Sequence, residues 1–492
     1  MRPGKDVLHV MADTALESDP ASAPPQPGDY DFIVVSNRLP VDRVTVDGQS
    51  DWRRSPGGLV TALAPVMEHA DGAWVGWNGA ADEPLEEFDH SGMHLVPVDL
   101  SAREVELYYE GFANTTLWPL YHDVIAPPEF HRTWWDAYRR VNRRFAEASA
   151  KAAAEGATVW VQDYQLQLVP AMLRQLRPDL RIGFFNHIPF PPLEIYAQLP
   201  WRQQVLEGLA GADLIGFQRP GDAQNFSRCV RRFLGAQSRQ GVFSITDEDG
   251  AERQVEARAF PISIDSRHIA ELAADPDVID RAQQIRHELG DPTTVLLGVD
   301  RLDYTKGIPH RLKAFGELLE DHRVSVEDCT LVQVASPSRE RVEHYKTLRD
   351  EVESTVGRIN GTYDTLEKTA IRYLHQSYPV EEMVALYLAA DVLLVTALRD
   401  GMNLVAKEYV AARSRNNGVL VLSEFTGAAE QLRQALLVNT HDIDGVKNAM
   451  VRAIHMEPRE AARRMRAMRK QVLEHDVKRW SSDFLSALQE NR

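Results

Sequence analysis

The sequence predicts an α/β protein made of two doubly wound domains, each with a parallel β-sheet covered by helices. From residue 31 the chain repeats a short apolar run, a polar or glycine-containing turn and an amphipathic segment. This alternation is typical of parallel sheets flanked by helices. The pattern starts again near residue 295, and a chain of 492 residues, 44% of them hydrophobic, is long enough to bury two separate cores.

The strands are expected at short runs of apolar residues, which indicate strands buried on both faces. In the first half these runs are 32–35, 159–161, 182–185 and 214–217, and in the second half 295–299, 331–334, 392–395 and 419–422. Between the halves we expect a helical segment over 266–290, followed by a break at Gly290-Asp291-Pro292.

The domain boundary is placed near residue 268. We expect a disordered tail, an amino-terminal domain, a carboxyl-terminal domain and a last amphipathic helix, at 1–29, 30–268, 269–465 and 466–492 respectively. The tail is rich in Pro, Ala, Ser and Asp, a composition that disfavours a packed core. In the last helix Trp480, Phe484 and Leu485 have near-helical spacing, so that they can dock on one surface.

Composition and motifs disfavour several classes of function. The formal net charge of −17 repels nucleic acid and anionic membranes, so an anionic ligand must be held by a local basic cluster. Cys229 and Cys329 form neither a CxxC motif nor a zinc-ligand pattern. The sequence has no GxGxxG or P-loop motif, no signal-peptide pattern and no apolar run of membrane-spanning length. We expect a cytoplasmic protein without nucleic-acid, membrane, metal or cofactor partners.

The candidate functional residues are polar side chains next to the apolar runs, because ligands of open parallel sheets bind beyond the carboxyl ends of the strands. Arg38, Asp163 and His187 follow three of these runs. A single histidine is more often structural than catalytic, but a proline-rich turn follows this one. Gly57 and Gly58 would let backbone N–H groups approach an anion at a helix start, although a glycine pair is more often only a turn.

Arg301 and Lys306 follow the first strand of the second half, five residues apart. Two fixed cations at a strand-to-helix turn suit a diphosphate, whose oxygens need charge neutralisation while a glycosidic bond breaks. Arg339 repeats the placement of a cation after a strand. In the alternative interpretation this segment is a solvated loop, in which Asp300 and Asp303 pair with the two cations.

The most informative segment is 397–409. A strand is expected to end at Asp400, Gly401 turns the chain, and Asn403 starts a helix whose free N–H groups suit a phosphate. Glu408 lies five residues into this helix, where its carboxylate can accept hydrogen bonds from both hydroxyl groups of a ribose. Helix capping alone would explain Asp400 and Asn403 but not Glu408.

The segment 442–446, Asp-Ile-Asp-Gly-Val, superficially matches the nucleophile loop of haloacid-dehalogenase phosphatases. No region of the size of a phosphatase follows it. Asp442 is better explained as the cap of a helix over 443–455.

Seven motifs, in the same order, resemble the trehalose-6-phosphate synthase family of glycosyltransferases from about residue 30 to 485. The last two are specific, whereas the glycine pair is not. The motifs are Ser36-Asn37-Arg38-Leu39-Pro40, Gly57-Gly58-Leu59, Tyr109 to Trp118-Pro119, Val161-Gln162-Asp163-Tyr164, His187-Ile188-Pro189-Phe190-Pro191, Arg301-Leu302-Asp303-Tyr304-Thr305-Lys306-Gly307 and Arg399-Asp400-Gly401-Met402-Asn403-Leu404-Val405-Ala406-Lys407-Glu408. The resemblance implies the GT-B fold, in which two Rossmann-like domains face each other across a cleft and the last helix crosses back to the first domain.

The resemblance also implies a role for each candidate, with Arg301, Lys306, His187 and Asp163 as the catalytic set. Glucose 6-phosphate would lie against the amino-terminal domain and a nucleoside-diphosphate glucose in the cleft. The implied contacts are Arg38, Tyr109, Trp118 and Arg339 for the acceptor phosphate; Asp163 near the acceptor sugar; His187 near the donor glucose; Gly58, Arg301 and Lys306 for the donor diphosphate; and Asp400, Gly401, Met402, Asn403, Leu404 and Glu408 for the donor sugar, phosphate and ribose.

The implied reaction transfers glucose to glucose 6-phosphate with retention and without a metal, giving an α,α-1,1 link. Two alternatives stay open. One is another GT-B enzyme, such as a glucosylglycerol-phosphate synthase or a glycogen-type synthase, and the other is a non-catalytic sensor of sugar nucleotides. The sequence does not decide among UDP-, ADP- and GDP-glucose. Members of the family are often dimers or tetramers, so we expect a homo-oligomer.

Overall fold

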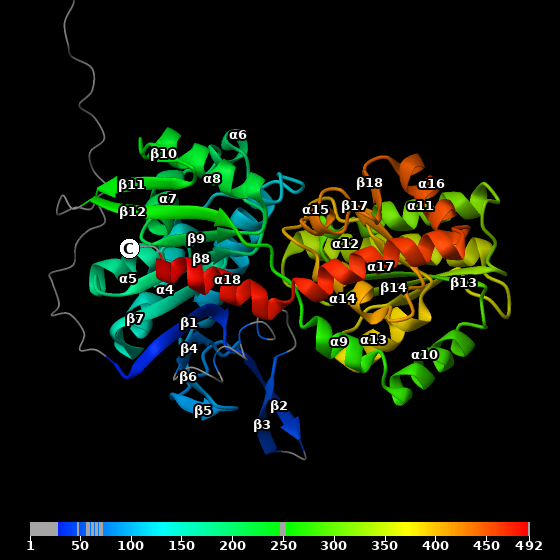
Figure 1. Ribbon diagram of the computed structural model, residues 1–492, viewed down its shortest axis with the longest axis horizontal. Helices are drawn as coiled ribbons and strands as arrows, with labels where there is room; N and C mark the ends of the chain where they lie inside the picture. Colours follow the sequence, from blue (N-terminus) through cyan, green and yellow to red (C-terminus); the bar gives the residue numbers. More distant parts are fainter. Residues whose placement is uncertain are drawn as a thin grey trace, which may run out of the picture.

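The computed structural model describes residues 28–46, 49–55, 60, 63, 67, 72–246 and 252–490. Two largely parallel sheets organise this part of the chain, one in each half. Figure 1 shows them side by side, each covered by helices. All eight apolar runs lie within strands, so the prediction of a two-domain doubly wound α/β fold is confirmed.

The first sheet is parallel in its centre and antiparallel at both edges. A separate hairpin joins β2 (Val41–Val46) to β3 (Gln49–Arg54). The order of the sheet is β10 (Ser238–Arg239), β11 (Val242–Thr246), β12 (Glu252–Ala259), β9 (Leu214–Phe217), β8 (Arg181–Asn186), β7 (Ala153–Gln162), β1 (Tyr30–Arg38), β4 (Gly72–Trp77), β6 (Met93–Pro97) and β5 (Phe88–His90).

The second sheet is parallel throughout its described strands. Such a sheet needs helical crossovers, which place helices on both of its faces. Its order is β15 (Ile371–Leu374), β14 (Cys329–Ser336), β13 (Thr294–Arg301), β16 (Val392–Val395), β17 (Val419–Ser423) and β18 (Leu436–Val438).

The helices alternate with the strands, as the repeating sequence pattern predicts. In the first half they are α2 (Ala102–Glu104), η1 (Val105–Leu117), α3 (Trp118–Tyr121), α4 (Arg132–Ala152), η2 (Tyr164–Leu166), α5 (Val169–Leu176), α6 (Leu193–Tyr196), α7 (Arg202–Leu209) and α8 (Pro220–Phe233). In the second half they are α9 (Ser266–Leu272), α10 (Pro276–Glu288), η3 (Tyr304–Lys306), α11 (Ile308–Glu320), α12 (Glu343–Tyr363), α13 (Val380–Ala389), α14 (Leu404–Ala412), α15 (Ala428–Gln431), α16 (Ile443–Ile454), α17 (Pro458–Glu474) and α18 (Val477–Glu490).

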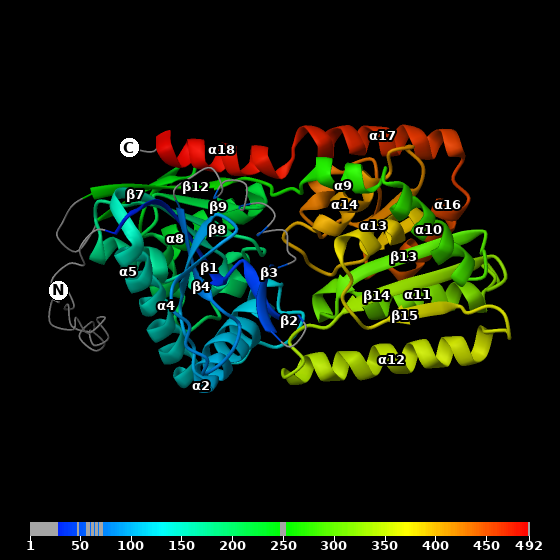
Figure 2. The ribbon, with the colours of Figure 1, turned by 90° about the horizontal axis from the view of Figure 1, so that it is seen from below.

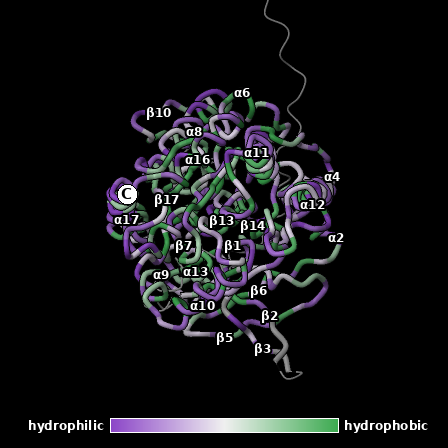
Figure 3. Tube along the Cα trace, turned by 90° about the vertical axis from the view of Figure 1, so that its right-hand side faces the viewer, coloured by the Kyte–Doolittle hydropathy of each residue, from purple (hydrophilic) through white to green (hydrophobic). Residues whose placement is uncertain are grey.

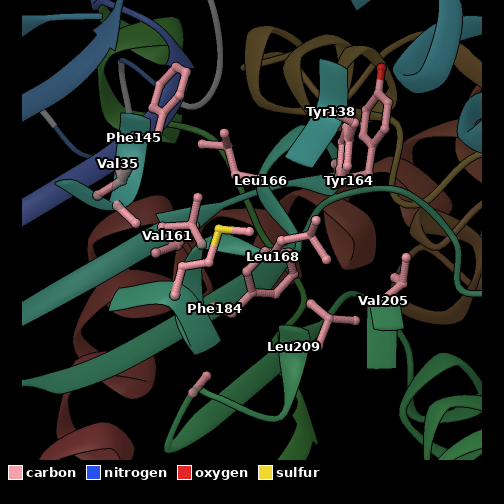
Figure 4. Close-up of a cluster of buried hydrophobic side chains, with 14 of the residues drawn as sticks. Val35, Tyr138, Phe145, Val161, Tyr164, Leu166, Leu168, Phe184, Val205 and Leu209 are labelled. Carbon is pink, nitrogen blue, oxygen red and sulfur yellow. The ribbon is translucent and has the colours of Figure 1, made fainter. Parts of the chain in front are cut away.

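The core lies on both faces of each sheet. Figure 4 shows part of the core around the first sheet, where Val161 and Phe184 from adjacent strands share a cluster with Tyr138 of α4 and Leu209 of α7. Burying one such side chain contributes about 1.5–3 kcal/mol. Along the chain trace most hydrophobic stretches lie inside and most hydrophilic ones at the periphery (Figure 3).

An extended linker, 260–265, joins the two halves between β12 and α9. The carbonyl groups of its alternate residues 260, 262 and 264 accept hydrogen bonds from Trp480 Nε1 (3.2 Å), Lys407 Nζ (2.5 Å) and Val477 N (3.0 Å). The linker is therefore held by elements from the second half of the chain. The domain boundary near residue 268 stays a prediction.

The last two helices lie against different halves of the molecule. Helix α17 packs on α14 and β17, whereas α18 packs on β8 and β9 of the first sheet. The ring of Phe484 stacks on Trp160 at 4.4 Å, and a Cβ on either Gly183 or Gly216 would come within 2.8 Å of that ring. Figure 2 shows the two helices running end to end along one side of both halves.

Some sequence predictions are corrected by the structure. The helix expected over 266–290 is two helices, because Asp275 caps a new helix that has Pro276 at its first position. The strand expected to end at Asp400 ends at Val395, since the carbonyl of Ala397 accepts from the side-chain hydroxyl of Ser423 (2.6 Å) instead of from a backbone N–H of the neighbouring strand β17.

Of four further predictions, one is confirmed, one is corrected and two lie outside the described residues. Asp442 caps α16 through Gly445 N at 2.9 Å, as expected. Arg38 is the last residue of β1 rather than part of the following turn. Residues 57–59 of the glycine motif and residues 1–27 of the expected tail lie outside the described residues.

Candidate active site

A cavity of about 240 Å³ lies between the two halves, at the carboxyl ends of their central strands. It brings together most of the predicted site residues, although they come from distant parts of the chain. The first half contributes Tyr109, Trp118, His122, Asp163, Tyr164, Gln165, His187 and Ile188, and the second half Arg301, Lys306, Arg339, Asp400 and Gly401.

Lys306 and Asp400 form an ion pair of 2.6 Å in this cavity, with side chains 10% and 15% exposed. Burial raises the pKa of the Asp400 carboxyl, but the pairing with Lys306 outweighs burial and holds this pKa below its usual value. Asn403 Nδ2 donates a second hydrogen bond to the same carboxylate at 3.2 Å. The cation of Lys306 therefore has a fixed position.

Arg301 differs from Lys306, because its side chain is exposed and forms no ion pair with any described residue. Its guanidinium lies 5.4 Å from the centroid of the Trp118 ring. Asp303 pairs with Arg339 at 3.3 Å, and Asp300 pairs with Arg311 at 2.6 Å. The alternative pairing of Asp300 and Asp303 with the two cations is therefore wrong, and the charge of Arg301 is available to a ligand.

Arg339 is held by a network that is buried beneath the cavity. Its side chain is 5% exposed, and it donates to Asp303 Oδ2, to Tyr345 Oη and to Tyr164 Oη, the last at 3.0 Å. The guanidinium also lies 3.8 Å from the centroid of the Trp118 ring. Burial alone would raise the pKa of Asp303. The positive charges of the nearby arginines outweigh this effect and hold the pKa well below its ordinary value. The network thus fixes a cation beside an aromatic ring.

Asp163 and His187 face the cavity from the first half. Asp163 follows β7 with φ at 73°, a left-handed conformation that costs a non-glycine residue about 1–3 kcal/mol. Its Oδ1 accepts from His187 N at 3.0 Å. Burial raises the pKa of the Asp163 carboxyl to about 6.

The imidazole of His187 is neutral, since burial lowers its pKa to about 3. Its Nε2 lies 2.9 Å from Gln162 Oε1. With the amide oxygen as acceptor, Nε2 carries the proton and Nδ1 is left as a hydrogen-bond acceptor. The ring is therefore suited to contact an uncharged hydroxyl group.

The segment 400–408 forms the third part of the site. Asn403 adopts φ of 82° and caps α14 by accepting from Ala406 N at 3.0 Å, as predicted. A Cβ on Gly401 would collide with the carbonyl oxygen of His187, so the two halves meet closely at this glycine. Met402 is buried and Leu404 partly buried beside it. The free N–H groups at the start of α14 suit an anion.

Glu408 lies further along α14, beyond the residues that line the cavity. Tyr387 Oη donates to Glu408 Oε2 at 2.6 Å. Burial raises the pKa of this carboxyl, against the opposing effect of the hydrogen bond. The pair leaves the second oxygen, Oε1, without a bond from the described residues, so that it can accept from a ligand.

Among the predicted residues that the structure describes, those that do not line this cavity are Arg38, Met402, Asn403, Leu404 and Glu408. Arg38 is exposed and pairs with Asp42 at 2.9 Å, and its guanidinium lies 5.3 Å from the Trp77 ring. That ring in turn lies 6.0 Å from Tyr109 on the cavity wall. Gly58 lies outside the described residues.

His122 and Tyr164 line the cavity but were not among the predicted residues. His122 Nδ1 lies 2.8 Å from the carbonyl oxygen of Trp118, and burial lowers the pKa of its imidazole to about 3. The spacing of four residues between Trp118 and His122 is a helical signal that places both side chains on one face. Tyr164 was visible as the neighbour of Asp163 in its motif.

Two Rossmann-like halves with a cation-lined cavity between them define a glycosyltransferase of the GT-B class. A family model described as glycosyltransferase family 20 matches residues 30–490, and the chain belongs to this family. The trehalose-6-phosphate synthase of Mycolicibacterium gilvum (strain PYR-GCK) is 57% identical over 484 residues, a match that covers 96% of each chain. That of Mycolicibacterium smegmatis is 57% identical over 466 residues, covering 94% of this chain and 93% of the relative.

Two solved structures are also similar to this chain in fold and sequence. The α,α-trehalose-phosphate synthase (UDP-forming) of Burkholderia xenovorans in complex with glucose-6-phosphate has a TM-score of 0.85 at 34% identity, covering 93% of this chain and 99% of that one. The E. coli protein bound with UDP-2-fluoro glucose has a TM-score of 0.84 at 36% identity, covering 93% and 98%.

Neither a membrane-spanning helix nor a metal-binding cluster is found in the part of the chain that the structure describes. None of the helices there is both long and apolar enough to traverse a bilayer. Nor do three or more His, Cys, Asp or Glu side chains gather there in a way that would hold a metal ion.

Proposed function

We propose that this chain is a retaining glucosyltransferase that moves glucose from a nucleoside-diphosphate glucose to glucose 6-phosphate, giving α,α-trehalose 6-phosphate and the nucleoside diphosphate. The observation that carries the proposal is the cavity between the halves, where Lys306 and Arg301 face Asp163 and His187. The names of the relatives and the glucose-6-phosphate and UDP-2-fluoro glucose in the neighbouring structures support the same substrates.

On the donor side, Arg301 and Lys306 neutralise the diphosphate as it leaves. Because their charges act on a group whose negative charge grows during bond breaking, they stabilise the transition state more than the ground state. The Asp400 carboxylate and the backbone of residues 401–404 bind the glucosyl group and a phosphate, and Glu408 accepts hydrogen bonds from the ribose.

On the acceptor side, Arg339, Trp118, Tyr109 and Arg38 surround the phosphate of glucose 6-phosphate. Asp163 accepts a hydrogen bond from the acceptor sugar, and neutral His187 contacts the donor glucose. Attack occurs on the face from which the diphosphate departs, within an ion-pair-like transition state. This route retains configuration without a covalent intermediate.

The test is initial-rate glucosyl transfer to glucose 6-phosphate from UDP-, ADP- and GDP-glucose in EDTA, with the anomeric link determined by NMR. We expect an α,α-1,1 disaccharide phosphate with at least one donor. Transfer that is abolished by EDTA would contradict metal independence. Transfer to glycerol 3-phosphate or a glucan, but not to glucose 6-phosphate, would favour another GT-B activity.

We also propose that the protein acts in the cytoplasm as a homo-oligomer, a dimer or tetramer. Sedimentation equilibrium at micromolar concentration tests the assembly, since a monomer mass across the whole concentration range would contradict it. Fractionation of the cell tests the compartment.

A further inference from the structure

A second concavity lies at the outer end of the first half and is formed by other residues than the cavity described above. It has a volume of about 650 Å³ and is formed by one side of α8, the turn between β10 and β11, and the end of β12. These elements lie together at the upper left of Figure 1. Its volume is in the range of about 300–1,000 Å³ that is usual for small-molecule sites. We call it the α8 groove.

The α8 groove is basic. Arg228, Arg231 and Arg258 line it and are exposed, and its other lining residues include no aspartate or glutamate. The stretch 223–246 contains four arginines and no acidic residue, in a chain whose formal net charge is −17. The polar side chains that share the groove are Gln224, Ser227, Ser238 and Gln240.

Two of these three arginines form no ion pair that would hold the fold of the described residues. Arg228 and Arg231 are three residues apart on α8, which makes them neighbours on its surface, and neither forms an ion pair with a described residue. The guanidinium of Arg258 packs over the Phe260 ring at 4.6 Å and lies 3.5 Å from Glu256. Unpaired like charges at this spacing repel each other, whereas an anion between them would relieve the repulsion. Guanidinium groups match phosphate oxygens in geometry and charge.

The first turn of α8 lies beside Arg399, next to the candidate site. Asp222 is 2% exposed and lies 3.6 Å from the guanidinium of Arg399, which also pairs with Asp123 at 3.2 Å. Arg399 directly precedes Asp400, the partner of Lys306. The next two residues of α8 after Asp222 line the groove. A short, rigid element thus connects the groove to the donor side of the active site.

We propose that the α8 groove is a regulatory site for a small phosphorylated metabolite, which changes the rate of glucosyl transfer through α8 and the Asp222–Arg399 contact. The binding part of this proposal is independent of the proposed function, and only the effect on rate rests on it.

Calorimetric titration of pyrophosphate into the protein tests binding, with UDP and glucose 6-phosphate present at saturation so that the anion sites of the cleft are occupied. The double variant Arg228→Gln/Arg231→Gln removes the two unpaired cations, and Arg232→Gln removes an exposed cation of the same helix that does not line the groove. We expect the wild type and Arg232→Gln to bind alike and the double variant to bind about 10-fold more weakly or worse.

Absence of binding to the wild type, or equal binding to the double variant, would overturn the site. Binding of citrate but not of pyrophosphate to the same arginines would overturn the assignment to phosphate. Because the substituted side chains are exposed, the variants are expected to fold, and their circular dichroism and Tm check this.

Initial rates with and without pyrophosphate test regulation. The three proteins should have the same basal kcat, and pyrophosphate should change the rate of the wild type and Arg232→Gln by about 5-fold or more, but not that of the double variant. The same response in all three would place the effect in the catalytic cleft and overturn the regulatory role. If no transfer occurs at all, the proposed function fails while the calorimetry still decides the binding site.

Discussion

The two walls of the cleft differ in the form of the ionisable groups that they favour, neutral on one wall and charged on the other. On the wall from the first half, burial raises the pKa of Asp163 to about 6 and lowers that of His187 to about 3, so both groups are pushed toward their neutral forms. The wall from the second half keeps its charges, with Lys306 and Arg339 in ion pairs and Arg301 exposed. The first wall therefore suits contact with uncharged sugar hydroxyl groups, and the second suits an anionic phosphate.

The largest expected effect is that of Lys306→Met, which removes a cation from the charged wall. Loss of one charge-stabilising group costs about 2.7–4 kcal/mol of transition-state stabilisation, so kcat should fall about 100- to 1000-fold. The buried carboxylate of Asp400 would also lose its partner, so the Tm should fall. Steady-state kinetics and thermal melts measure the two effects.

The double variant Lys306→Met/Asp400→Asn separates these two effects. It should regain most of the lost Tm, because no unpaired charge remains, but none of the activity. An unchanged Tm in the single variant would show that the pair is not stabilising.

The next effect is that of Gly401→Ala, which acts on the contact between the walls. The added Cβ would collide with the His187 carbonyl and push the walls apart. Misplacement of about 1 Å costs about 100-fold in rate, so kcat/KM should fall by that factor. Gly357→Ala on α12 is the matched control, since nothing lies within 4 Å of its Cβ, and it should keep full activity. Equal activity of the two variants would contradict close contact at Gly401.

The smallest effect is that of Asp163→Asn on the stability of the protein. Asp163 lies on the wall from the first half, which favours neutral groups. The pKa of Asp163 is higher in the folded protein than in the unfolded chain, so its contribution to stability is greatest below the unfolded value near 3.8 and is lost as pH rises through about 6. Asp163→Asn should therefore raise the free energy of unfolding by on the order of 1 kcal/mol at pH 7–8, which is about 1–2 °C in Tm for a chain of this size, and leave it unchanged at pH 4. A variant that is less stable at pH 8 would contradict this. Melts at the two pH values measure the difference.

The sequence predicts the fold better than it predicts the charge pairing. The strands are found because their apolar runs are local signals, and the cap at Asn403 is likewise local. The ion pair of Lys306 with Asp400 spans 94 residues, and only the meeting of two loops creates it. Sequence spacing suggested nearer partners for the cations, and these partners proved to be engaged with Arg311 and Arg339.

The sequence analysis also missed a break between two helices and a contact between the two halves. The break between α9 and α10 was signalled by Asp275-Pro276, a cap followed by proline at the first helical position. The role of Asp222 was not visible, because an aspartate in the first turn of a helix is normally a favourable dipole partner and no more. Its contact with Arg399 is a product of how the two halves pack.

Arg301→Ala tests directly whether the wall from the second half stabilises the leaving diphosphate. Arg301 is exposed and has no ion-pair partner among the described residues, so its removal should lower the Tm less than Lys306→Met does and isolate the catalytic effect. We expect kcat at saturating donor and glucose 6-phosphate to fall about 100- to 1000-fold. Near-normal turnover in this variant would contradict this stabilisation.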